Sequence, residues 1–99
     1  MIQFIITYEV EDRAGFYNAL KEEGILEANL AEEGCWRYEY YASMDDEKCL
    51  IALENWRSLE DQQAHMKLPH FEKIMRLEKV YGAKPSIKVH ECSEIAFEL

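Results

Sequence analysis

Residues 34–71 read GCWRYEYYASMDDEKCLIALENWRSLEDQQAHMKLPHF and contain most of the structural signals in the chain. Two runs with the alternating pattern of strands, Cys35–Ala42 and Cys49–Trp56, flank a polar turn. Carboxylates at the tip of that turn can accept hydrogen bonds from nearby backbone amides, which favours a tight reversal. The segment therefore predicts a β-hairpin. Three aromatic side chains are expected on one face of its first strand: Trp36, Tyr38 and Tyr40.

A helix is expected directly after the hairpin. The Ser58 hydroxyl can accept from an unpaired backbone amide, and Asp61 stands three residues further on, as in a capping box. This helix should run to about Lys67, because Pro69 disfavours helical geometry at the residue before it. A second helix is predicted over His70–Tyr81.

The N-terminal part predicts a strand within Met1–Glu11 and a long helix over Arg13–Glu32, with Asp12 as its N-cap. Gly24 would cost this helix about 1 kcal/mol relative to Ala, unless it marks a kink or a close contact. A last strand is predicted over Ser86–Glu94, followed by the apolar tail 95–99.

The expected element order is β-α-β-β-α-α-β, within one domain spanning residues 1–99. Four antiparallel strands with helices on one face make a ferredoxin-like α+β fold. The other sheet face would be bare in a monomer, and large apolar faces seldom stay exposed. We therefore expect a homodimer in which two sheets pack together, with the apolar tail reaching the partner.

The formal net charge is -9, which disfavours nucleic acid and anionic membranes as partners. No apolar run approaches the length of a membrane span, and no basic segment followed by an apolar stretch opens the chain. We expect a cytoplasmic protein. The sequence also contains no phosphate loop, dinucleotide fingerprint, nucleophile elbow or haem attachment motif.

His65 and His70 are the candidate catalytic residues, because an imidazole can accept a proton from a substrate near neutral pH. His70 is expected at a helix start, where the helix dipole favours the neutral imidazole. A buried histidine bonded to a carbonyl is the competing structural interpretation of His65. The five-residue spacing is not that of a helical metal pair and no third ligand is evident, so no metal site is expected.

The combination of motifs resembles the antibiotic-biosynthesis-monooxygenase-like family, which includes small quinol monooxygenases. The similarity covers about residues 1–75 and is most specific over Glu33–Phe71: a Gly-Cys-x-x-Tyr-x-x-Tyr strand, an acidic turn, Glu-Asn-Trp, a capped helix with Ala-His, and Pro-His-Phe. The resemblance implies a dimeric α+β barrel. It also implies oxidation of electron-rich phenols by dioxygen without metal, flavin or other cofactor, in a pocket that takes a small aromatic substrate.

The resemblance further implies that an aromatic residue at the position of Trp56 lines the pocket between sheet and helices. Tyr38 and Phe71 are the other candidate wall residues, and Asn55 matches a substrate-orienting residue of some family members. Strand parity places Asn55 and Trp56 on opposite faces, so both cannot point into one pocket.

Three other functions are compatible with this sequence. An isomerase of a small phosphorylated signal molecule needs basic pocket residues, for which Arg37, Lys67 and Lys73 are the candidates. A haem-degrading relative would need an Asn on the first strand, and residues 1–10 contain none. A non-catalytic dimeric module that binds small molecules has the same fold.

Overall fold

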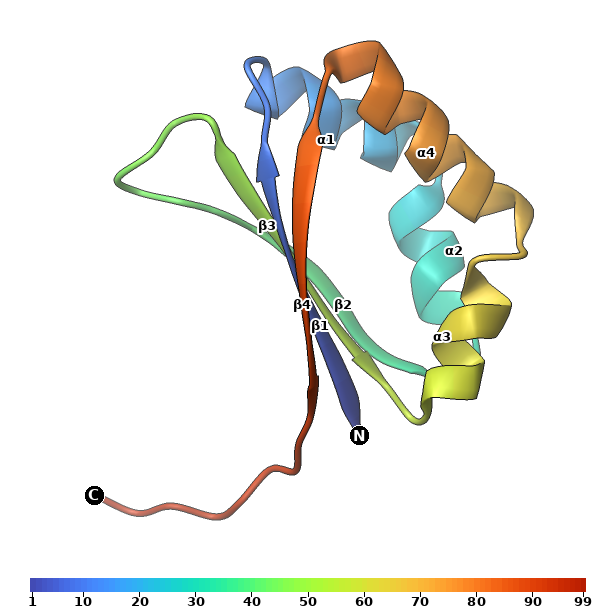
Figure 1. Ribbon diagram of the computed structural model, residues 1–99, viewed down its shortest axis with the longest axis vertical. Coiled ribbons are helices and arrows are strands. Elements are labelled where there is room, and N and C mark those ends of the chain that lie inside the picture. Colours follow the sequence, from blue (N-terminus) through green and yellow to red (C-terminus); the bar gives the residue numbers. More distant parts are fainter.

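The structure is a computed structural model that describes residues 1–99, and it has two layers: a sheet, and helices that all cover one of its faces (Figure 1). The strands are β1 (Ile2–Glu9), β2 (Cys35–Ala42), β3 (Cys49–Trp56) and β4 (Lys84–Glu91). The helices are α1 (Arg13–Glu22), α2 (Ile25–Ala31), α3 (Leu59–His65) and α4 (Pro69–Tyr81). The sheet has the order β2-β3-β1-β4 with antiparallel pairs throughout. The predicted ferredoxin-like α+β fold is confirmed.

The core lies between the sheet and the helices. Phe4 and Tyr8 of the central strand β1 point into it, as do Phe16 and Leu20 of α1. The Tyr8 and Phe16 rings meet edge to face, with their centroids 5.2 Å apart. This arrangement follows from the alternation of β1, which sends every second side chain toward the helices.

The predicted long helix over Arg13–Glu32 is wrong, because the structure divides it into two helices. Gly24 adopts φ 72°, a left-handed conformation that interrupts the helical hydrogen bonding between α1 and α2. Glycine reaches this region without steric cost. The consequence for function is that α2 turns in a new direction and ends at Glu32, its C-cap.

The predicted placement of Trp36 beside Tyr38 is also wrong. A β-bulge between Cys35 and Arg37 shifts the register of β2 against β3, so Cys35 is buried and Trp36 is 58% exposed. A bulge adds one residue to a strand and reverses the facing of the side chains before it. Tyr38 and Tyr40, beyond the bulge, share one face as predicted, and in the structure that face is turned toward the helices.

The predicted N-caps at Asp12 and Ser58 are confirmed, whereas the start of α4 and both ends of β4 differ. The Asp12 carboxylate accepts from the Gly15 amide at 3.0 Å, and the Ser58 hydroxyl accepts from the Asp61 amide at 3.2 Å. Helix α4 begins at Pro69 rather than His70, since proline fits the first helical position. Strand β4 begins and ends earlier than predicted, at Lys84 and Glu91, because it pairs with the full length of β1.

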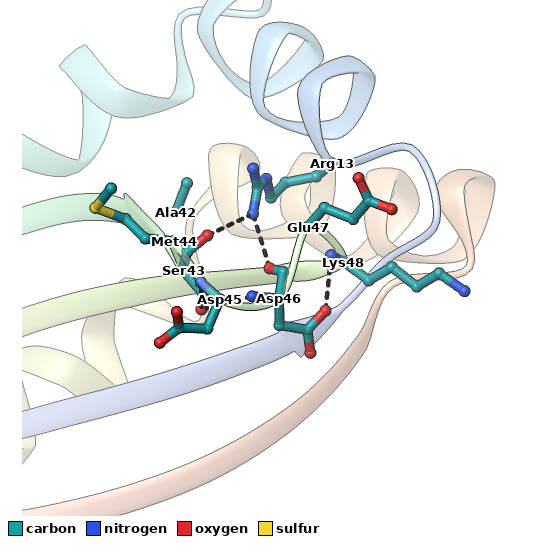
Figure 2. A pocket seen from close by; sticks show the side chains of 8 residues that line it. All are labelled: Arg13, Ala42, Ser43, Met44, Asp45, Asp46, Glu47 and Lys48. Carbon is teal, nitrogen blue, oxygen red and sulfur yellow. Dashed lines mark hydrogen bonds between the residues drawn. The ribbon is translucent and has the colours of Figure 1, made fainter.

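The β2–β3 turn is held by one side chain from the first helix (Figure 2). One terminal nitrogen of Arg13, Nη1, donates to the carbonyl oxygens of Ser43, Asp46 and Cys49 at 3.1, 3.0 and 3.2 Å. The Asp46 carboxylate accepts from the Lys48 amide at 2.9 Å. Figure 2 shows these hydrogen bonds among the residues that line a hollow beside the turn, and they order the turn.

Strand β4 and the tail expose large apolar side chains. Ile87 and Val89 are 57% and 50% exposed, and Ile95 and Phe97 are each 79% exposed. The tail runs away from the sheet (Figure 1). No helix is long and apolar enough to span a membrane.

Candidate functional site

A cavity of about 400 Å³ lies between the sheet and the helices α3 and α4. This is a volume typical of small-molecule sites. Its walls are mainly apolar, with rings from the sheet and the helices: Phe4, Tyr8, Tyr38 and Phe71. Its polar lining groups are Glu54, Glu78, His65, Gln62 and Gln63.

Glu32 joins the two candidate histidines at one side of this cavity. Its oxygen Oε2 lies 2.6 Å from His65 Nδ1 and 2.7 Å from His70 Nε2. A carboxylate oxygen only accepts, so both imidazoles donate an N–H to it. The three residues come from the ends of α2 and α3 and the start of α4.

The hydrogen bond from Nδ1 fixes the state of His65. In the neutral imidazole the other ring nitrogen, Nε2, is then an acceptor. Burial lowers the pKa of His65, while Glu32 opposes that shift, so the neutral form is favoured. His65 is 1% exposed and lines the cavity. It therefore combines a fixed tautomer with an unprotonated nitrogen, as a general base requires.

Glu54 is a buried carboxyl group beside that histidine. It is 2% exposed, and one of its oxygens accepts from Trp56 Nε1 at 2.8 Å. Burial raises its pKa to about 7, and the Trp56 hydrogen bond acts in the opposite direction. The Trp56 and His65 rings lie 4.9 Å apart between centroids. Trp56 thus packs between a carboxyl group and an imidazole.

Glu78 is a second carboxyl group on the cavity wall. It accepts a hydrogen bond from the Tyr8 hydroxyl at 2.7 Å. Burial raises the pKa of Glu78, which the Tyr8 hydrogen bond partly offsets. Burial also raises the pKa of Tyr8, so this phenol stays a donor. The cavity accordingly offers two carboxyl groups to a ligand.

The structure brings most of the predicted site residues together. His65, Tyr38 and Phe71 line the cavity. Trp56 lies behind His65 and is fully buried. His70 lies outside the cavity lining and contacts it only through Glu32 and the His65 ring, 5.4 Å away.

Asn55 lies on the opposite face of the sheet. Its side-chain oxygen accepts from Gln3 Nε2 at 3.1 Å, and it is not among the cavity-lining residues. The strand parity noted from the sequence accounts for this placement. A substrate-binding role for Asn55 stays a prediction.

Sequence reasoning missed three acidic residues of the site. Glu54 had a detectable signal, because it stands on the apolar face of its strand, in line with Leu50 and Ala52. Glu78 and Glu32 had none, since their roles depend on contacts with Tyr8 and with the histidines, which lie far away in sequence.

Glu32 also changes the expectation about metals. No third ligand was evident beside His65 and His70 in the sequence, but in the structure ligand-type atoms of Glu32, His65 and His70 lie within 4.8 Å of one another. These three residues are the set that could hold a metal ion. In this structure the carboxylate oxygen is instead the acceptor for both imidazoles.

Comparison with known proteins agrees with this fold. The family profile described as Antibiotic biosynthesis monooxygenase matches residues 5–77. No curated protein matches the chain in sequence.

Several solved structures are similar. A conserved protein from Methanosarcina mazei Go1 has 25% identity and a TM-score of 0.81, covering 93% of this chain and 92% of its own. A candidate antibiotic biosynthesis monooxygenase from Deinococcus radiodurans has 20% identity and a TM-score of 0.84, and the match covers 100% of this chain and 99% of the other. SnoaB, a cofactor-independent oxygenase from Streptomyces nogalater, has 9% identity and a TM-score of 0.81, and the match covers 98% of this chain and 97% of the other.

Proposed function

We propose that this chain, which belongs to the antibiotic biosynthesis monooxygenase family, oxidises a quinol or polyphenol with dioxygen and needs no bound cofactor. The observation that supports this most strongly is His65, a buried imidazole with a fixed tautomer on the wall of an aromatic cavity. The structural likeness to a cofactor-independent oxygenase agrees with the proposal.

The chemistry begins with a phenol lying flat among the aromatic side chains. His65 Nε2 takes the phenolic proton, and Glu32 stabilises the resulting imidazolium through Nδ1–H. The proton stays inside the site, so the net charge of the cavity does not change. The electron-rich phenolate then transfers one electron to dioxygen, and the two radicals combine to a peroxide at a ring carbon.

The peroxide breaks down with balanced atoms and electrons. His65 returns the phenolic proton to the peroxide. The ring carbon then loses its one hydrogen and becomes a carbonyl with one oxygen atom, while the second oxygen atom leaves as water with that hydrogen and the returned proton. The substrate supplies the two electrons that reduce the second oxygen atom to water, so no external reductant takes part. The protein positions the ring, moves the proton and excludes water.

His70 and Trp56 act through His65 in this mechanism. His70 donates to the same Glu32 oxygen and so holds the carboxylate in place. Trp56 packs against the His65 ring and limits its rotation. Tyr38 and Phe71 form the wall against which the substrate ring lies.

The cavity disfavours the isomerase alternative. A phosphorylated substrate needs cationic partners. None of the lining residues is Lys or Arg. Arg37 is exposed on β2 and paired with Glu39, while Lys67 and Lys73 are exposed outside the cavity.

We also propose that the functional unit is a homodimer. The sheet face away from the helices carries half-buried apolar residues, among them Ile5, Ile51 and Leu53. A second copy would cover this face and the exposed tail. Leu53→Lys should convert the dimer to a folded monomer in size-exclusion chromatography with light scattering. A parent protein that elutes as a monomer at micromolar concentration would contradict this.

Oxygen consumption by chelator-treated protein with a panel of quinols and polyphenols tests the proposed function. His65→Gln should lower the rate about 100-fold or more, the range for a lost general base. Glu72→Gln, at an exposed position of α4 outside the cavity lining, is the control and should retain full activity. Labelled dioxygen should place one labelled atom in the product.

Three results would contradict the proposal. They are no consumption across the panel, equal rates for the parent and His65→Gln, or product without label. Binding of phenols without turnover would instead indicate the non-catalytic binding module.

A further inference from the structure

The cavity has an unbalanced set of charged groups. Its 16 lining residues include the carboxyl groups of Glu54 and Glu78 and no Lys or Arg. The one basic lining group is His65, and Glu32 already provides its counter-charge at 2.6 Å. The cavity therefore has no cation that is free to neutralise a carboxylate.

Both carboxyl groups retain capacity for a ligand. Each has a hydrogen bond from an uncharged donor, Trp56 Nε1–H for Glu54 and the Tyr8 hydroxyl for Glu78. An ionised carboxylate has about four lone-pair sites, so these bonds leave acceptors open. A buried carboxylate without a cation is unfavourable, and a cationic ligand would remove that cost.

The remaining walls suit a cation as well as a flat ring. Four aromatic side chains line the same cavity: Phe4, Tyr8, Tyr38 and Phe71. The faces of such rings attract ammonium groups, more strongly when water is excluded. Aromatic faces combined with two carboxyl groups are the chemistry that recognises an amine attached to a ring.

We infer that this cavity selects phenols that carry a protonated amine, held by Glu54 and Glu78, and that it rejects phenols that carry a carboxylate. This inference rests on the proposed function in taking the same cavity as the substrate site. Glu54 and Glu78 determine specificity, and the base remains His65. Burial raises the pKa of both carboxyl groups, which is the desolvation cost that a cationic ligand would offset.

A matched series of ligands tests the selection. Dopamine, ethylcatechol and dihydroxyphenylacetate share one catechol ring and differ in the charge of a short side chain. Their affinities are measured by titration calorimetry in oxygen-free buffer at about pH 7.5, where the amine is protonated and the acid ionised. We expect dopamine to bind about 10-fold tighter than ethylcatechol. We expect dihydroxyphenylacetate to bind at least about 10-fold weaker than ethylcatechol.

Variants locate the selecting groups. Glu54→Gln and Glu78→Gln should each reduce the preference for dopamine over ethylcatechol to roughly 3-fold or less. Glu72→Gln makes the same charge change at an exposed position of α4 and should keep the full preference. If a glutamine variant fails to fold, the order of the three ligand affinities measured on the parent protein still tests the inference.

Three outcomes would overturn the inference. They are equal affinity for the three ligands, tighter binding of dihydroxyphenylacetate, or no binding of dopamine at millimolar concentration. Because binding is measured without oxygen, its failure is separable from failure of the oxidation. The affinity order without oxygen consumption would support the inference and contradict the proposed function. Oxygen consumption without this order of affinities would contradict the inference and support the proposed function.

Discussion

Replacing Glu54 with Gln should make the stability of the protein less dependent on pH. Burial raises the pKa of Glu54 from an ordinary 4.5 to about 7 in the folded protein. That difference corresponds to about 3 kcal/mol of unfolding free energy. Gln keeps a side-chain oxygen that can accept from Trp56 Nε1, so the packing is preserved.

The sign follows from the raised pKa. The folded state disfavours the ionised carboxyl, so this group's contribution is fully present below pH 4.5 and is lost as pH rises through about 7. Glu54→Gln has no such loss. Its stability relative to the parent should therefore increase by roughly 2 kcal/mol between about pH 5.5 and pH 8. The lowered pKa of His65 has the opposite effect on stability, but it is common to both proteins and cancels.

Urea unfolding at a series of pH values measures this difference. Glu72→Gln, at an exposed position of α4, is the control and should follow the parent. A stability difference between Glu54→Gln and the parent that stays constant across this pH range would refute the reasoning. It would mean that Glu54 ionises in the folded protein as it does in water.

Three further substitutions test local features by urea unfolding. Asp12→Ala removes the acceptor for the Gly15 amide and should cost about 1 kcal/mol; an unchanged midpoint would count against this cap. Arg13→Ala removes the donor to three carbonyl oxygens of the β2–β3 turn and should cost roughly 1–3 kcal/mol, with faster hydrogen exchange at Ser43. Gly24→Ala, at φ 72°, should cost about 1 kcal/mol, and a gain in stability would contradict the helix break.

Local signals in the sequence were sufficient to predict the fold. The hairpin, the caps at Asp12 and Ser58 and the interruption near Pro69 each depend on neighbouring residues, so they are readable from the chain alone. A kink at Gly24 was one of the alternatives read from the sequence, whereas the bulge before Arg37 was not predicted. The bulge depends on the register between β2 and β3, which a periodic pattern does not encode.

Some residues of the candidate site could likewise be predicted from the sequence, and others could not. Tyr38, His65 and Phe71 were candidates because of their residue types, and strand alternation further placed Tyr38 on the aromatic face of β2; all three line one cavity. Glu32 could not be predicted, because it meets His65 and His70 only after α2, α3 and α4 converge.

The most direct test of the account is whether His65 takes a proton from a phenol bound in the cavity. Nitrocatechol resists oxidation, and its phenolate has its own visible absorbance, so ionisation can be followed during binding in oxygen-free buffer. We predict that the parent protein increases the ionised fraction of bound nitrocatechol. We also predict that His65→Gln binds the ligand without increasing ionisation, whereas Glu72→Gln, at an exposed position of α4, behaves as the parent does. Equal ionisation in the parent and His65→Gln would contradict the assignment of His65 as the base.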